Sequence, residues 1–299
     1  MYANTSALPD TQKTNAAGHA NFIATEPVGG RRVDIGTGFA ASNFDHGMFG
    51  GLMDPLVMVD HFTMTEPTFG THPHAGISAV SVMLEDSQGP YHNRDSLGND
   101  IDLEPGDLYW LKAGRGAVHN EGPRPGARAH GLQVFVNLPA SDKHDAPESL
   151  HVRASDMPEI RGEGHRVRVV LGDSQDVSGH LSPASPLTVL DVHIDRDGSF
   201  RHTIGANAHA FVLAIRGHGR IVTDDATVTL PAGHAIAARS NIGTSALTLH
   251  SEQGAQFVII EGEPLDQPIA QRGGFVMNTP EELTSAFAAH AAGEFGHID

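Results

Sequence analysis

Hydrophobic and polar positions alternate along much of the chain, in short runs that Gly, Pro, Asp and Asn interrupt. Alternation of this kind is typical of β-strands with one buried face. Many such runs at close spacing, with turn residues between them, predict an all-β sandwich or barrel. The expected strands are 55–60, 78–84, 107–111 and 131–136 in the first half, and 166–171, 187–194, 210–215, 220–223, 227–230 and 256–260 in the second.

The two halves share a local motif. Leu103-Glu-Pro-Gly-Asp107 leads into a strand in the first half, and Leu230-Pro-Ala-Gly-His234 does so in the second. An internal duplication explains this most economically. Residues 137–147 carry two prolines and no periodicity, which indicates a boundary. We therefore expect two related β-barrels in tandem, one over residues 29–145 and one over 146–262.

The two ends of the chain depart from the strand pattern. Residues 1–28 are polar and without periodicity, which predicts a flexible N-terminal arm. Residues 263–299 form a C-terminal tail in which one short helix is expected after Thr279. Thr279 is a suitable N-cap, and Glu282, three residues later, completes a capping box.

Composition narrows the function classes. The 299 residues fit two domains, and a formal net charge of −17 opposes binding to nucleic acid or to an anionic membrane. Cysteine is absent, which excludes disulfides, thiolate metal sites and cysteine nucleophiles. The chain has neither a long apolar run nor a signal-peptide pattern at its start, so we expect a cytoplasmic protein without a membrane partner.

Two short stretches carry candidate metal ligands: His72-Pro-His74 and His119-Asn-Glu121. On a strand, residues two apart point to the same side, so two such strands facing each other would gather three imidazoles and one carboxylate. Nitrogen and oxygen ligands without thiolate suit Fe, Mn, Ni, Cu or catalytic Zn. A chain with 20 histidines also produces some such pairs by chance, so the surrounding motifs carry weight.

Several other residues have a structural and a functional interpretation. His92 is left open between a place at the site and a solvent-exposed loop. Residues 60–62 are assigned to buried structure rather than to a pocket wall, and Trp110 and Phe135 to the core rather than to a platform for substrate. None of the three most comparable histidines of the second half, His209, His218 and His234, belongs to a His-x-His or His-x-Glu pair, so we expect no second metal there.

Six motifs follow one another in a fixed order: His72-Pro-His-Ala-Gly76, 92–99, 105–110, 113–121, Pro264-Leu265 and 274–279. In this order they resemble the pirin family of bicupins, over roughly residues 30–299. Family members usually read His-Pro-His-Arg-Gly-Phe-Glu-Thr at the first motif, whereas this chain continues with Ala75-Gly-Ile-Ser-Ala79. The strand beside the expected metal site therefore differs, while all four candidate ligands are present.

The resemblance implies two cupin (jelly-roll) barrels in tandem, with a mononuclear metal in the N-terminal barrel and none in the C-terminal one. The residues that match the family's ligands are His72, His74, His119 and Glu121. Iron is the usual metal, so Fe(II) is expected, with Mn, Ni, Cu and Zn as alternatives. The resemblance also implies that the C-terminal tail packs back on the N-terminal barrel.

The resemblance implies two kinds of function. Some members have quercetin 2,3-dioxygenase activity, which predicts a flavonol-like aromatic substrate, O2 as the second substrate and Glu121 as the catalytic base. Others are described as transcriptional co-regulators or partners of metabolic enzymes. The alternative is therefore a non-enzymatic regulator whose metal state controls binding to a partner protein.

Overall fold

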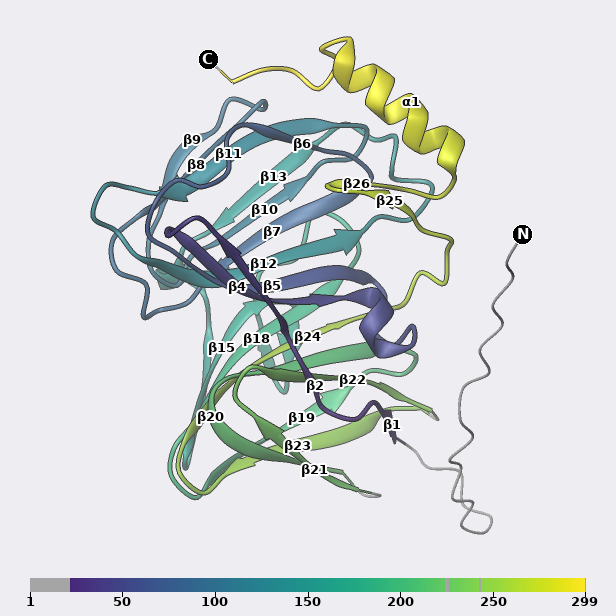
Figure 1. The fold of residues 1–299 in the computed structure, drawn as a ribbon. Coiled ribbons are helices and arrows are strands. Elements are labelled where there is room, and N and C mark those ends of the chain that lie inside the picture. The colour runs from purple at the N-terminus through teal and green to yellow at the C-terminus, as the bar shows by residue number, and fades with distance from the viewer. Residues whose placement is uncertain (1–21, 224–225, 242, 299) are drawn as a thin grey trace.

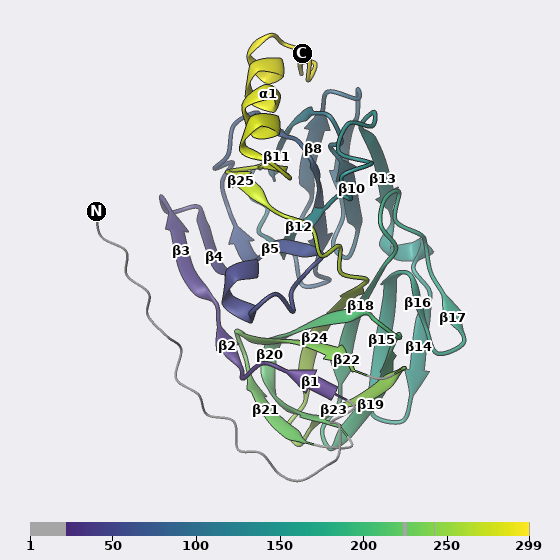
Figure 2. The same cartoon turned by 90° about the vertical axis from the view of Figure 1, so that its right-hand side faces the viewer.

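The computed structural model describes residues 22–223, 226–241 and 243–298. Its strands form two barrels that stack one above the other, and the only helix longer than one turn among these residues lies on the first barrel (Figures 1 and 2). The all-β fold with one C-terminal helix is therefore confirmed. Most of the expected flexible arm, residues 1–21, lies outside the described residues.

Two antiparallel sheets form the N-terminal barrel. Its strands are β3 (Arg31–Ile35), β4 (Phe39–Asp45), β5 (Leu56–Met64), β6 (His72–His74), β7 (Ile77–Met83), β8 (Tyr91–Asp95), β9 (Asp100–Leu103), β10 (Leu108–Lys112), β11 (Ala117–Pro123), β12 (Ala129–Asn137) and β13 (Glu148–Val152). The larger sheet has the order β13-β10-β7-β12-β5-β4-β3 and the smaller one β6-β11-β8-β9. A 3-10 turn, His46–Phe49, follows β4.

The C-terminal barrel is built around a sheet with the order β1-β22-β20-β24-β18-β15-β14. Its strands are β1 (Phe22–Ala24), β2 (Val28–Gly29), β14 (Glu159–Gly162), β15 (His165–Leu171), β16 (Asp173–Ser174), β17 (Val177–Ser178), β18 (Leu187–Ile194), β19 (Gly198–Ile204), β20 (His209–Val222), β21 (Thr227–Pro231), β22 (His234–Ser240), β23 (Ser245–Ser251) and β24 (Ala255–Gly262). A 3-10 turn, Ala154–Asp156, precedes β14.

Two strands lie outside the expected domain limits. β1, at the end of the expected flexible arm, pairs with β22 of the second barrel, so the arm does not extend to residue 28. β13, beyond the expected boundary at residue 145, pairs with β10 of the first barrel. In both cases a short segment satisfies the backbone groups of a strand that would otherwise be a sheet edge.

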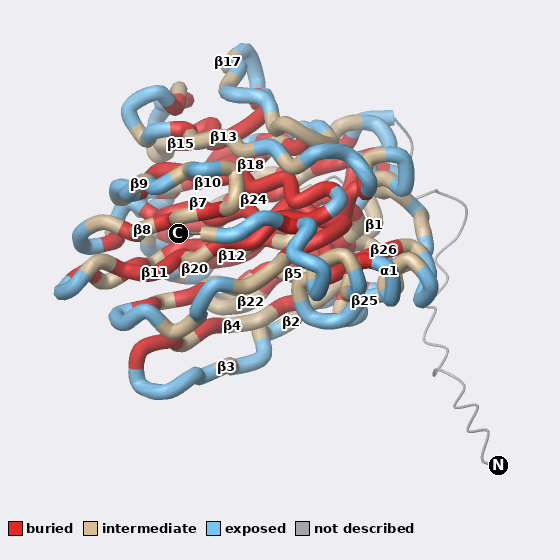
Figure 3. Tube along the Cα trace, turned by 90° about the horizontal axis from the view of Figure 1, so that it is seen from above, coloured by how far each residue is buried: buried red, intermediate tan, exposed pale blue. Residues whose placement is uncertain are grey.

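The two barrels share a hydrophobic core. On β12 the even-numbered side chains, such as Val134, point toward the second barrel, and on β20 Phe211 and Leu213 point back toward the first. β7, beside β12 in this sheet, is buried on both faces, which Figure 3 shows in red, whereas β3 at the sheet edge is exposed. The odd-numbered side chains of β12 therefore point into the first barrel.

The C-terminal tail folds as a hairpin and a helix, β25 (Ala270–Arg272), β26 (Phe275–Met277) and α1 (Pro280–Ala291). Thr279 caps the helix through the capping box expected from the sequence. Among the described residues, no helix is long and apolar enough to cross a membrane.

The tail is fastened to the N-terminal barrel at its backbone. Ala75 and Phe275 form a parallel bridge, next to an apolar cluster that includes Val118 and Ala286. Lys143, in the loop between β12 and β13, donates hydrogen bonds to the carbonyl oxygens of Gly76 and Val276, each at 2.8 Å. Two segments of the first barrel and the tail hairpin therefore meet at the Lys143 side chain.

Candidate metal centre

Three histidines converge between the two strands that the sequence singled out. β6 and β11 pair antiparallel, and His72 stands directly opposite His119 in the register. The Nε2 atom of His119 lies 2.9 Å from that of His72 and 3.0 Å from that of His74. The sequence spacing therefore brought the three imidazoles together as expected.

The remaining ring nitrogens show which tautomers face the centre. Nδ1 of His72 lies 2.8 Å from the carbonyl oxygen of Gly70, and Nδ1 of His74 lies 3.3 Å from that of Gly274. A carbonyl oxygen only accepts, so both Nδ1 atoms carry the proton and both Nε2 atoms present lone pairs. These lone pairs point at the Nε2 atom of a third histidine, an arrangement that a bound cation would stabilise.

The electrostatics also fit a metal. Burial, with the neighbouring His72 adding to it, lowers the pKa of His74 to about 3. Burial likewise lowers the pKa of His119 well below its usual value, and that of His72. Neutral imidazoles are the form that binds metals. Separations near 3 Å are about those of neighbouring ligands on an octahedral ion with bonds of about 2.1 Å.

Glu121 is not part of the imidazole group, which contains only the three histidines. It is buried on β11 and its Oε2 accepts a hydrogen bond of 2.8 Å from the Ser81 hydroxyl. It also hydrogen-bonds Tyr91. Burial raises the pKa of Glu121 to about 7, and these two hydrogen bonds act in the opposite direction. The carboxyl group therefore lies beside the histidines in a setting that suits proton exchange near neutral pH.

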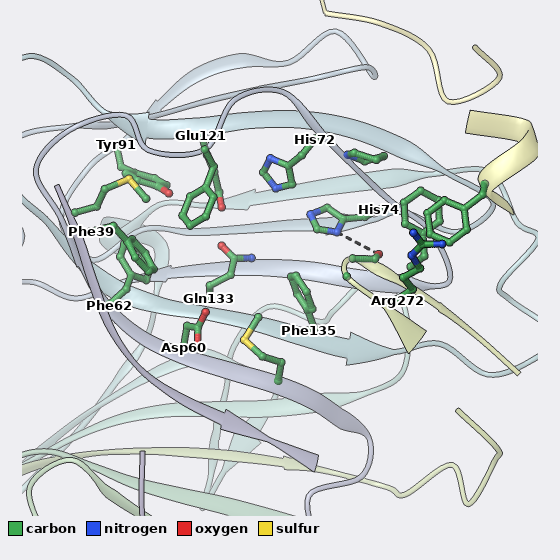
Figure 4. Close-up of a pocket in the computed structure, with 18 residues that line it drawn as sticks. Phe39, Asp60, Phe62, His72, His74, Tyr91, Glu121, Gln133, Phe135 and Arg272 are labelled. Carbon is green, nitrogen blue, oxygen red and sulfur yellow. Dashed lines mark hydrogen bonds between the residues drawn. The ribbon is translucent and has the colours of Figure 1, made fainter. Parts of the chain in front are cut away.

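A cavity of about 600 Å³ opens at the histidines (Figure 4). Its lining is largely aromatic and thioether, with a few polar groups. The lining residues are Phe39, Met58, Asp60, Phe62, Met64, Phe69, His72, Pro73, His74, Tyr91, Glu121, Gln133, Phe135, Arg272, Gly273, Gly274, Phe275 and Phe287. A pocket of this size and lining suits a ligand with aromatic rings.

Two structural assignments made from the sequence are corrected here. Phe135, expected in the core, lines the cavity with its ring centroid 5.1 Å from that of His74. Asp60 and Phe62 also line it, while His61 points to the other face and meets His130. The period of a strand shows that such residues face the barrel interior, but not that this interior holds a cavity. Trp110 is fully buried in the shared core, as expected.

The sequence left open whether His92 lies at the site. It also gave no indication of the contact between Ser81 and Gln133 in the cavity. His92 faces Asp100 across the β8–β9 pair, with 2.7 Å between Nε2 and Oδ1. The Ser81 hydroxyl also lies 3.0 Å from the Oε1 atom of Gln133, and its single hydrogen serves either this oxygen or Glu121. Register explains the second contact, because Ser81 and Gln133 are direct partners on β7 and β12. Only a strand alignment could have revealed it.

A second group of ligand-type side chains, Glu85, Asp191 and His193, lies between the barrels. Two arginines neutralise it. Nη1 of Arg168, a buried side chain, lies 3.4 Å from an oxygen of Asp191, and Arg166 pairs with Glu85. This charge balance fits an ion-pair network that joins the barrels rather than a cation site.

Comparison with known proteins identifies the family. Residues 34–136 match the family description Pirin, and residues 189–296 match the Pirin C-terminal cupin domain. The chain belongs to the pirin family. It is 34% identical to the human protein named Pirin over 236 residues, which cover 78% of this chain and 80% of the other. It is 31% identical to a pirin-like protein of Solanum lycopersicum over 245 residues, 82% of each chain.

The fold agrees with solved structures. A structure titled quercetin 2,3-dioxygenase from Acinetobacter baumannii superposes with a TM-score of 0.82 at 26% identity, covering 94% of this chain and 100% of that one. The bacterial pirin YhhW of Escherichia coli, solved in complex with nickel(II), shares the fold with a TM-score of 0.61 at 16% identity. The two barrels of this pirin are therefore cupin domains.

Proposed function

We propose that this pirin is a metal-dependent dioxygenase of flavonol-type substrates, with one transition metal held by His72, His74, His119 and Glu121. The observation that carries the proposal is the convergence of three neutral imidazoles on one wall of an aromatic cavity of about 600 Å³. The similarity to a protein titled quercetin 2,3-dioxygenase supports it. Ferrous iron is the proposed metal, and Mn, Ni, Cu and Zn are the alternatives with the same ligands.

The chain's own residues divide the work of the reaction. When bound, the metal supplies a Lewis acid and a redox centre for O2 chemistry. Glu121 takes the proton of the substrate's enol, because its carboxyl group lines the same cavity as His72 and His74. Ser81 and Tyr91 hold that carboxyl group through hydrogen bonds.

The cavity walls orient the substrate and exclude water. Phe62 and Phe135 present their rings to the cavity, and aromatic faces bind flat ring systems in offset or edge contacts. Gly274 and Phe275 of the C-terminal tail form a further wall. A reacting enolate in such a site is shielded from bulk solvent.

Oxygen uptake tests the proposal directly. Protein reconstituted with ferrous iron under anaerobic conditions is mixed with air-saturated buffer, with and without quercetin. We expect quercetin-dependent uptake in the natural protein and a loss of at least about a hundredfold in Glu121→Gln, because the base is removed while the side-chain shape is kept. Stoichiometric bound iron without uptake would contradict the dioxygenase and favour the non-enzymatic regulator, whose partner protein would then be sought.

A further inference from the structure

The cavity has one end rich in carboxyl and amide groups and another end with a cation. In Figure 4, Asp60, Gln133 and Glu121 lie to one side of His74, and Arg272 lies on the other. Arg272 belongs to β25 of the tail hairpin, whereas the other end is built by strands of the barrel. A ligand that fills the cavity therefore meets two different kinds of polar group.

The positive charge of Arg272 is available to a ligand. Its Cζ atom lies 5.1 Å from the ring centroid of Phe287, which holds the exposed side chain at the cavity mouth. No carboxylate within the described residues forms an ion pair with it. By contrast, the half-buried Arg124 pairs with Asp102 at 2.7 Å. In a chain with 36 acidic and 19 basic residues, a cation without such a partner at a cavity mouth favours an anionic ligand group.

The opposite end offers a donor in need of an acceptor. The Nε2 atom of Gln133 is buried and has no hydrogen-bond partner within the described residues, whereas its Oε1 lies 3.0 Å from the Ser81 hydroxyl. A buried donor without an acceptor is unfavourable, and an oxygen of a bound ligand would satisfy it. The amide therefore marks where the cavity would contact a carbonyl or hydroxyl oxygen.

We propose that the cavity selects aromatic ligands that carry an anionic substituent, a carboxylate or a sulfonate, which Arg272 binds at the mouth while Gln133 donates to a ligand oxygen near the histidines. A guanidinium suits this role because its parallel N–H groups match the two oxygens of such an anion. The inference rests on the proposed function in one respect: the ligand is assumed to react at the end of the cavity that holds the histidines. The charge preference follows from the cavity itself.

Two fluorescent probes with the same aromatic frame test the charge preference. Anilinonaphthalene sulfonate carries one sulfonate, and N-phenylnaphthylamine lacks it. In Arg272→Gln we expect sulfonate binding to weaken about tenfold, the loss of one charge-assisted contact, while the neutral probe changes less than about twofold. Arg272→Lys keeps the charge and is expected to retain most of the affinity for the sulfonate.

The matched control is Arg239→Gln, which removes an exposed arginine from the second barrel and is expected to leave both probes unchanged. Equal weakening of both probes in Arg272→Gln would show lost packing and overturn the inference, as would an unchanged affinity for the sulfonate. The titration needs no turnover. A protein that prefers the sulfonate but never consumes quercetin would refute the proposed reaction alone, and the reverse result would refute the charge preference alone.

Discussion

The two barrels place different side chains at equivalent interior positions. In the first barrel, β12 turns Gln133 and Phe135 inward. In the second, β24 occupies the same place in the sheet order and turns Phe257 and Ile259 inward, where they join a closed apolar cluster. Both strands point their other face into the same shared core. One architecture thus holds a ligand cavity in one copy and a packed interior in the other, and the inward side chains decide which.

The histidines of the two interiors teach the same lesson. In the second barrel His202 is buried, with Nδ1 3.1 Å from the Ser174 hydroxyl and Nε2 2.6 Å from a carboxylate oxygen of Glu261. Both of its nitrogens have partners of the usual kind. In the first barrel Nε2 of His74 faces only another imidazole nitrogen. A buried histidine points to a metal when its lone pair lacks a donor, not merely because it is buried.

The largest effect is expected when one histidine of the metal centre in the first barrel is replaced. His119→Ala takes away the imidazole that contacts both other histidines, so metal affinity should fall on the order of a thousandfold. His202→Ala is the matched control and should leave the metal content unchanged. Metal analysis after dialysis against a competing chelator measures both. Full occupancy in His119→Ala would show that the metal lies elsewhere.

Shortening a phenylalanine side chain should lower the free energy of unfolding more in the packed second barrel than in the first. Phe200 is 1% exposed in the core of the second barrel, so Phe200→Ala should lower the free energy of unfolding by about 3–5 kcal/mol. Phe135→Ala should cost only about 1–2 kcal/mol, because that ring already borders a cavity. Equilibrium urea unfolding of the metal-free proteins gives both values. Equal costs would mean that the first barrel is packed as tightly as the second.

The tail's contact with the centre should have an intermediate effect. A Cβ at Gly274 would lie 2.3 Å from Nδ1 of His74, so Gly274→Ala should displace the ring and its carbonyl partner and lower metal affinity about 10- to 100-fold. Gly273 has open space at its Cβ position and serves as the control. Gly273→Ala should strain only the backbone, whose φ is +59°, by about 1 kcal/mol of unfolding free energy. Similar metal affinities in the two variants would show that the tail does not influence metal binding at the histidines.

The smallest effect, taken per pH unit, is a pH dependence of stability that comes from the buried imidazoles of the centre. His74 has a pKa of about 3 in the folded protein and 6.5 as a free side chain. Between these values the unfolded chain binds more protons, so acid favours unfolding. The free energy of unfolding of the metal-free protein should fall with decreasing pH, by up to about 1.4 kcal/mol per pH unit from this residue. His74→Asn should flatten the curve, and an unchanged slope would contradict the assignment.

The sequence predicted strands where a hydrophobic run stands out, as at β5, β7, β12 and β18. The run expected at 187–194 is β18 as observed, and the helix after Thr279 has its capping box. The strand at residues 148–152 was missed because it exists only as the partner of β10. The expected runs 210–215 and 220–223 are one strand, β20, which changes its partner from β22 to β21 midway. Pairing of this kind is tertiary information that a local pattern does not contain.

The site was predictable to the extent that strand period and register determine it. A spacing of two residues was enough to predict that His72 and His74 point to the same side of their strand. The partner of His74, the carbonyl of Gly274, is 200 residues away in the chain and gave no local signal. The placement of Arg272 at the cavity mouth follows from the same distant hairpin. What spacing cannot supply is the part of a site that comes from another segment of the fold.

The tail also determines when, during synthesis on the ribosome, the pocket can be completed. A nascent chain emerges from its N-terminus, so the barrel with the three histidines is made before the second barrel. The wall formed by Gly274, Phe275 and Phe287 is made only after both barrels. A chain that stops after β24 would carry every histidine of the centre and yet lack the carbonyl that orients His74. Completion of the pocket is thus tied to completion of the polypeptide.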